Sequence, residues 1–322
     1  MSDNEVFADA FNYLLYGGKK KIKPEDLKPL DTSSICLEIK NTKVSKAVQK
    51  NRDVIKVLSA KRTDDLGLLI LGVENQANVH YAMPVRTMLY DSIQYASQVD
   101  KKSEENKKTK KCSNSDEFLS GFTKQDKLIP VITLVVYFGI KDWDAPTNIK
   151  DMFIDVDKSV APYLPYYKIN LIHPNLPDSE LLKLRSELGM VMQFIKNSND
   201  KKKLMDNLEN NKKFHNVSNI SATLIKETTG LNLKINKEKE RIDMCQAVKD
   251  LIKDATKEAN KQIKEANKQI KIEQEKNKAE KEKTKAEKEK TKAEKEKTKA
   301  ALLRIKELEK IIKNLQTQLK TA

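Results

Sequence analysis

The C-terminal part of the chain is a low-complexity repeat with a period of seven residues. The heptad EANKQIK occurs twice from Glu258, and KAEKEKT occurs three times from Lys278. Residues of this kind favour helix, and a seven-residue period is typical of coiled coils. Because so polar a segment cannot bury a core of its own, we expect a compact domain over 1–236 and a charged helical tail over 237–322.

The heptad register of the tail runs unbroken to its end. Position a holds Ile263, Ile270, Asn277, Thr284, Thr291, Thr298, Ile305, Ile312 and Leu319. Position d holds Ala259, Ala266, Glu273, Glu280, Glu287, Glu294, Ala301, Leu308 and Leu315. Positions a and d together form a seam that is apolar at both ends of the tail and polar in its centre. This pattern predicts a solvated central helix and last turns that pair weakly in a homo-oligomer. A charged helix without any partner fits the polar heptads about equally well.

The net charge of +15 is unevenly distributed along the chain. Residues 251–322 carry a surplus of nine positive charges, which leaves six for the first 250 residues. The lysine-rich tail therefore suggests nonspecific DNA affinity that weakens as salt rises.

The cysteines Cys36, Cys112 and Cys245 are too widely spaced for a disulfide framework or a paired-cysteine zinc site. With no bilayer-length apolar run and no cleavable leader, we expect a cytoplasmic protein without a membrane partner.

The first 250 residues mix helical and strand patterns. Residues 2–16 predict a helix capped by Ser2 or Asp3 and ended by Gly17, and residues 52–60 and 66–74 predict a β-hairpin. A helix is expected from Met83, with an apolar face of Val85, Met88, Leu89, Ser92, Ile93, Ala96 and Val99, followed by a charged loop over 101–115. Further strands are expected within 128–139 and 166–173, and further helices within 179–196 and 198–213. This order predicts an α/β domain with its sheet covered on both faces.

The hairpin makes a geometric prediction about two acids. A turn centred between Thr63 and Asp64 pairs residues whose numbers sum to 127, so Asp53 would lie opposite Glu74 with Cβ atoms about 4.5 to 5.5 Å apart. Such close carboxylates repel unless one is protonated or a cation lies between them. Gln76 shares their face, and a hard divalent ion held there could activate water for phosphodiester cleavage. Alternatively, both acids are solvated strand ends, since E-x-Q is a common tripeptide.

Other residues carry weaker functional signals. Asp9 on the first helix is a candidate accessory acid, although its early position in the helix is already favoured by the helix dipole. Arg86 and Tyr90 lie one turn apart after the hairpin and could contact the DNA backbone or be ordinary surface residues. His80 has neither a nucleophile nor a second histidine at metal-ligand spacing and is interpreted as structural, and Trp143 is expected to pack a loop.

Several segments resemble a known nuclease family. RDV…GVENQ resembles the D…(D/E)-x-K signature of PD-(D/E)xK phosphodiesterases, with Gln76 in place of the lysine. The segments SDNEVFADAFNYLLYGG, KPEDL, GVENQANVHYAMPVRTMLYD, FLSGF…DKLIPVITLVVYFG and YKINLI together are similar to the recombination-promoting nuclease and putative transposase family of that superfamily. The resemblance runs from Asp3 to Cys245 and leaves the repeated tail outside.

The resemblance implies a restriction-endonuclease-like core, in which a mixed central sheet is flanked by helices, in a cytoplasmic bacterial protein. It also implies DNA cleavage in recombination with a divalent ion, Mg²⁺ or else Mn²⁺ or Ca²⁺. Asp53 and Glu74 match the metal-binding acids, and Gln76 matches the signature lysine. Glutamine can hydrogen-bond but carries no charge, so the residue pattern leaves activity open. The leading hypothesis is an endonuclease linked to recombination or transposon-like movement. The alternatives are an inactive DNA- or protein-binding module that oligomerises through the tail, and a protein whose working part is the tail itself.

Overall fold

The computed structural model describes residues 1–30, 53–59, 68–236 and 238–320, with side chains described up to residue 314. The chain forms two compact units, Met1–Leu251 and Ile252–Ala322. The first unit extends beyond the 1–236 domain expected from the sequence. The reason is that strand β7 (Arg241–Ile242) pairs with β6 (Val217–Ser218), and the residues that follow it include buried Met244, Cys245 and Val248.

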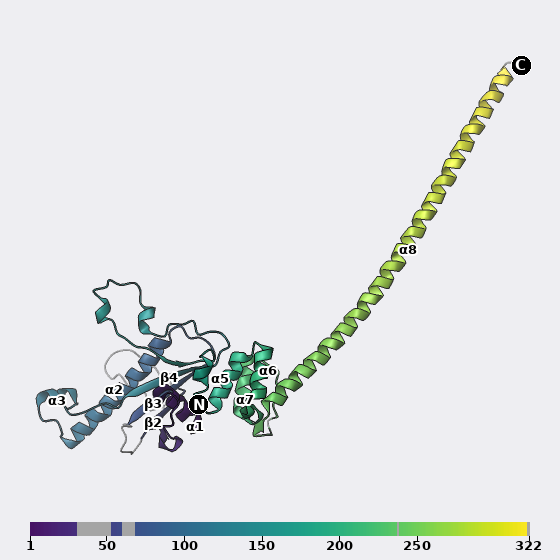
Figure 1. Cartoon of the computed structure of the whole chain (residues 1–322). Coiled ribbons are helices and arrows are strands. Elements are labelled where there is room, and N and C mark those ends of the chain that lie inside the picture. Colours follow the sequence, from purple (N-terminus) through teal and green to yellow (C-terminus); the bar gives the residue numbers. More distant parts are fainter. Residues whose placement is uncertain (31–52, 60–67, 237, 321–322) are drawn as a thin grey trace. The chain divides into compact units, whose positions relative to one another are not determined.

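The core of the first unit is a mixed five-stranded sheet (Figure 1). Its strands, in spatial order, are β1 (Leu27–Pro29), β2 (Val54–Leu58), β3 (Leu69–Gln76), β4 (Val131–Tyr137) and β5 (Asn170–Ile172). Strand β2 pairs antiparallel with both β1 and β3, whereas β3, β4 and β5 run parallel to one another. This arrangement confirms the mixed α/β fold with flanking helices that the sequence predicted.

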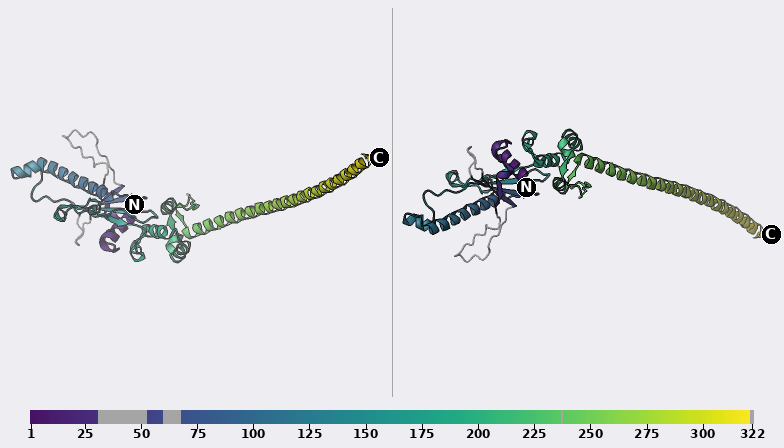
Figure 2. Two further views of the ribbon diagram at one scale, coloured as in Figure 1. Left: turned by 90° about the horizontal axis from the view of Figure 1, so that it is seen from above. Right: turned by 90° about the horizontal axis from the view of Figure 1, so that it is seen from below.

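Helices cover the sheet on both faces. Helix α2 (Met83–Thr109) lies over one face, and α1 (Asn4–Tyr16) lies over the other (Figure 2). On the α2 side, Met83 packs with Val135 and Ile169. On the α1 side, the ammonium of Lys56 lies 4.7 Å from the ring centre of Phe7. Helix α5 (Glu187–Asn197) packs against α1 in turn.

The first helix forms as the sequence predicted. The carboxylate of Asp3 accepts hydrogen bonds from the Glu5 and Val6 amides, and Gly17 ends the helix with a φ of 60°. The remaining helices are α3 (Ser115–Ser120), α4 (Asp178–Leu181), α6 (Lys201–Asn210), α7 (Asn219–Thr229) and α8 (Met244–Lys320). Short 3₁₀ turns are η1 (Pro24–Asp26), η3 (Ile149–Met152), η4 (Ala161–Tyr163) and η5 (Lys212–His215). Helix α7 was not predicted.

The buried face of α2 differs from the one predicted. Val85 and Ser92 are exposed, whereas the helix buries Met83, Pro84, Thr87, Tyr90, Asp91, Ile93, Gln94 and Asn106. Polar side chains can face the core because they find partners there: the Asp91 carboxylate accepts from the Thr133 hydroxyl at 2.5 Å and from the Tyr167 hydroxyl at 2.6 Å. Ile93 is buried as predicted, but the apolar pattern alone missed the polar residues that form much of the buried face.

The predicted loop over 101–115 is also wrong, because α2 continues to Thr109. The side-chain amide of Asn106 is buried and donates to the Gly121 carbonyl at 3.0 Å and to the Asp126 carboxylate at 2.7 Å. The Asp126 carboxylate also accepts from the Thr123 amide, and these hydrogen bonds hold the pKa of Asp126 far below its ordinary value. The charged residues up to Thr109 are thus the last turns of α2, and hydrogen bonds of the Asn106 side chain attach these turns to the loop that follows.

The second unit consists of the remainder of α8, whose described side chains are exposed from residue 255 to residue 314. A single continuous helix agrees with the predicted tail. Among the described helices, none combines the length and apolar character that a bilayer span requires.

Candidate active site

The register of β2 and β3, continued one residue beyond Val54, would bring Asp53 opposite Glu74. Val54 pairs with Val73 and Leu58 pairs with Leu69, so paired residue numbers sum to 127 and the predicted register is confirmed. The turn at Thr63 and Asp64 lies outside the described residues. Asp53 directly precedes β2, and its carboxylate accepts a hydrogen bond of 2.7 Å from the Asn75 amide. The main chain next to Glu74 therefore holds the Asp53 carboxylate.

The two acids share the face of the sheet that α2 covers. Side chains alternate along a strand, so Gln76 lies on the same face as Glu74, two residues closer to the end of β3. Glu74 is completely buried, Gln76 is partly exposed and Asp53 is exposed. The end of β3 thus carries a buried carboxylate and an amide, and the residue before β2 adds an exposed carboxylate.

A guanidinium group balances the charge of this acid pair. Nη2 of Arg86, on α2, lies 3.1 Å from a carboxylate oxygen of Glu74, and Nε donates to the Tyr90 hydroxyl at 3.2 Å. Burial alone would lower the pKa of Arg86, but the Tyr90 hydrogen bond and the charges of Glu74 and Asp53 raise it overall. The sequence indicated that two close carboxylates need a cation, and Arg86 provides one.

The nearby strand lysine does not replace the signature lysine. Lys56 on β2 is buried, but its side chain points to the α1 face, away from Glu74. Its ammonium donates to the Ser2 carbonyl at 2.7 Å, and burial lowers its pKa. Among the described residues, Arg86 on α2 is the cation that pairs with Glu74.

The other residues that the sequence singled out make contacts within the fold. The carboxylate of Asp9 accepts from the Ser186 amide at 2.7 Å, at the beginning of α5, on the α1 side of the sheet and away from Asp53 and Glu74. Tyr90 is 4% exposed, so its contact with Arg86 is internal and its predicted DNA contact stays a prediction. Trp143 packs edge-on against Tyr137 with ring centres 5.2 Å apart.

The acid pair has the ligand chemistry that a hard cation prefers, but it does not supply a full set of protein ligands. In the part of the chain that the structure describes, no three His, Cys, Asp or Glu side chains gather at one point. Two carboxylates and an amide oxygen are nevertheless the donors that Mg²⁺ prefers, with water and substrate phosphate supplying the other ligands. Asp53 and Glu74 could therefore hold such an ion, and Glu74 would then share its carboxylate between the ion and Arg86.

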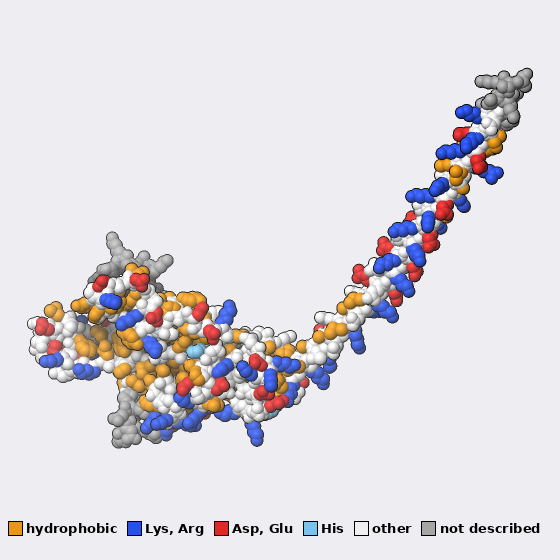
Figure 3. Space-filling model, turned by 45° about the horizontal axis from the view of Figure 1, so that its top comes forward, with side chains coloured by type: hydrophobic (Ala, Val, Ile, Leu, Met, Phe, Trp, Pro, Cys, Tyr) orange, Lys and Arg blue, Asp and Glu red, His pale blue; other side chains and the backbone are white. Residues whose placement is uncertain are grey.

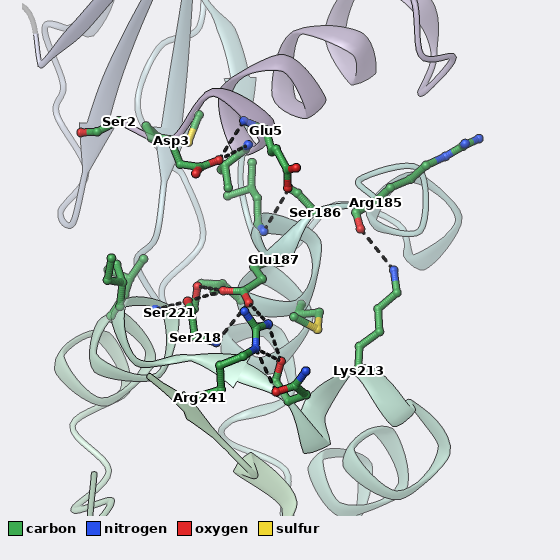
Figure 4. A pocket seen from close by; sticks show the side chains of 18 of the residues that line it. Ser2, Asp3, Glu5, Arg185, Ser186, Glu187, Lys213, Ser218, Ser221 and Arg241 are labelled. Carbon is green, nitrogen blue, oxygen red and sulfur yellow. Dashed lines mark hydrogen bonds and ion pairs between the residues drawn. The ribbon is translucent and has the colours of Figure 1, made fainter. Parts of the chain in front are cut away.

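A separate cavity of about 880 Å³ lies among α1, α5 and the β6–α7 segment (Figure 4). At its centre the Glu187 carboxylate accepts from the Ser218 amide at 3.0 Å and the Ser221 hydroxyl at 2.6 Å, and it pairs with Arg241 at 2.7 Å. Burial would raise the pKa of Glu187, but these partners lower it overall. This cluster was not predicted, because its members come from three segments that are distant in the sequence. We interpret it as the connection that joins β6 and β7 to α5.

These observations define an α/β domain with an acid pair and a glutamine at the end of its central strand. Residues 71–221 match the model of the family described as "Putative transposase, YhgA-like". The match confirms the family resemblance, covers Glu74, Gln76 and Arg86, and begins after Asp53. Neither the curated proteins nor the solved structures contain a significant match to the chain.

Proposed function

We propose that the protein is a metal-dependent DNA endonuclease linked to recombination or transposon-like DNA movement. The observation that carries the proposal is the register of β2 and β3, which sets Asp53 opposite the buried Glu74 with Gln76 on the same face. The family description supports it, because a transposase acts on DNA and must break phosphodiester bonds to move it. The substrate class therefore follows from the family, and the reaction follows from the acid pair.

Each residue of the proposed site has a defined task. Asp53 and Glu74 would hold a divalent ion, which would supply positive charge for the phosphate and acidity for a water molecule. The Gln76 amide orients that water or a phosphate oxygen by hydrogen bonding. The Asn75 amide keeps the outer carboxylate in place through its 2.7 Å hydrogen bond to Asp53.

Arg86 supplies the positive charge that Gln76 lacks. Its guanidinium contacts Glu74, and its side chain is 30% exposed. A guanidinium is always protonated and can donate two parallel hydrogen bonds to a phosphate. Arg86 would share the Glu74 carboxylate with a bound ion and could direct one N–H toward the substrate phosphate. It thereby performs the electrostatic task that a lysine performs in the signature.

A cleavage assay with matched variants tests the proposal. The full chain is incubated with supercoiled plasmid and Mg²⁺, Mn²⁺ or Ca²⁺, beside Asp53→Asn, Glu74→Gln and the control Glu104→Gln, which alters an exposed acid on α2. We expect Mg²⁺- or Mn²⁺-dependent nicking that is reduced at least about a hundredfold by the first two changes and unaffected by the third. Cleavage that persists in folded Asp53→Asn and Glu74→Gln proteins would refute the site.

One observation favours a second function, a DNA-binding module without catalysis. The Glu74–Arg86 ion pair already balances the buried charge without any metal. In that case the wild-type protein would bind DNA with the same affinity in Mg²⁺ and in a chelator, and it would not nick the plasmid under any metal condition.

A further inference from the structure

The end of the helical tail presents an apolar surface. Figure 3 shows apolar side chains near both ends of the tail and charged side chains between them. Near the C-terminal end, more than half of the surface of each of these side chains is exposed: Leu302, Leu303, Ile305, Leu308, Ile311 and Ile312. A single helix in water gains nothing from such a row, whereas a second helix packed against it would bury the row.

The residue types along this surface select two parallel strands. In the register of the repeat, Ile305 and Ile312 occupy position a, and Leu308 occupies position d. A β-branched residue at a with leucine at d favours a parallel dimer over larger bundles. The apolar positions continue in the sequence through Leu315 and Leu319, which gives about three heptads of suitable seam.

The flanking charges fit the same arrangement. Arg304 occupies position g, and Glu309 occupies position e of the following heptad. In a parallel dimer, position g of one helix faces position e of the next heptad on the other helix. Arg304 would thus face Glu309 of the second copy, twice by symmetry, whereas an antiparallel pair sets g against g and e against e.

The central heptads prevent the pairing from extending toward the domain. Their g positions are Lys276, Lys283, Lys290 and Lys297, and their e positions are Lys281, Lys288 and Lys295, so a parallel pair would oppose lysine with lysine. The a-position hydroxyls of Thr284, Thr291 and Thr298 donate to carbonyls of their own helix at 2.8 to 2.9 Å. The centre is therefore satisfied as a single helix.

We propose that residues 301–319 form a short parallel two-stranded coiled coil with a second copy of this chain, while residues 273–299 stay unpaired. The unpaired stretch is a spacer of roughly 40 Å on each chain, at 1.5 Å per residue. The dimer links two first units through two separate helices. Because a seam of three heptads is short, the dimer should be weak. The fraction of dimer should therefore rise with protein concentration.

Sedimentation equilibrium of the full chain tests this dimer. The average mass should rise with concentration from 36.9 kDa toward twice that value and no further. Leu308→Lys, at position d, should weaken association by about tenfold or more, which is at least 1.4 kcal/mol. Leu303→Lys is the matched control, because Leu303 is 60% exposed against 53% for Leu308 but lies at position f, away from the seam. Circular dichroism confirms that both variants stay helical.

A charge exchange tests the parallel direction. Arg304→Glu and Glu309→Arg should each associate more weakly than wild type, because each sets like charges at both g–e contacts. Mixing the two variants should restore association, since every contact in the mixed dimer joins opposite charges. A monomer at all concentrations, a trimer, an equal loss in Leu303→Lys, or no gain on mixing would overturn the proposal. These measurements read mass, so they do not depend on whether the protein cleaves DNA.

Discussion

Breaking the Glu74–Arg86 ion pair gives the sharpest test of how the site is built. In Glu74→Gln, the guanidinium of Arg86 loses its 3.1 Å partner while it remains largely beneath the surface. Removal of one partner from a buried pair costs about 3–5 kcal/mol. Because Glu74 is fully buried but Arg86 is 30% exposed, water recovers part of this loss, and we expect about 2–4 kcal/mol.

Fluorescence of Trp143 is the suitable assay. It is the only tryptophan of the chain and packs in the first unit against Tyr137, so its signal excludes the helical tail that dominates circular dichroism. With a urea dependence of about 2–3 kcal/mol per molar, the midpoint of Glu74→Gln should fall by about 1 M. The control Glu104→Gln, which changes an exposed acid, should leave the midpoint unchanged.

A double-mutant cycle decides whether the ion pair is the cause. Arg86→Gln leaves the buried Glu74 carboxylate without the guanidinium, so it should also destabilise the first unit. The double variant Glu74→Gln/Arg86→Gln should lose about 1–3 kcal/mol less than the sum of the single variants. Additive losses would refute the coupling between these side chains.

Three further predictions concern other parts of the molecule. Truncation after Arg241 should unfold the first unit because it removes buried Met244, Cys245 and Val248, whereas truncation after Leu251 should preserve its Trp143 unfolding transition. Burial lowers the pKa of His173, so the folded state binds fewer protons and stability should fall as pH drops below about 6.5; this loss should disappear in His173→Asn if that residue causes it. Finally, DNA affinity should fall less steeply with salt in the Leu251 truncation than in the full chain, and equal slopes would exclude the tail lysines from binding.

The hairpin was predictable because its determinants are local. Alternation along a strand fixes which side chains share a face, and the observed pairing of Val54 with Val73 has the register inferred from the sequence. The long tail helix was predictable for a similar reason, since its seven-residue period is a local property. The first helix carried its own capping residues, Asp3 and Gly17.

The contacts of α2 were not predictable from its own sequence. Its apolar pattern selected a face that includes Val85, but the helix instead turns Tyr90 and Asp91 toward the sheet. That choice depends on hydroxyls from Thr133 and Tyr167, which lie 42 and 76 residues beyond Asp91. The Arg86–Glu74 contact depends on the same rotation of the helix, and therefore it also required the tertiary structure.

The ion pair connects the stability of the first unit to its proposed chemistry. Without a divalent ion, Arg86 compensates the buried charge of Glu74 and thereby stabilises the contact between α2 and β3. A divalent ion at the acid pair would compete with Arg86 for the Glu74 carboxylate. The cost of weakening the ion pair would therefore reduce the affinity for the ion. The released guanidinium would then lie beside a bound phosphate, where positive charge is useful. The replacement of the signature lysine by Gln76 is therefore compatible with catalysis, since a cation from the neighbouring helix is already close to the acid pair.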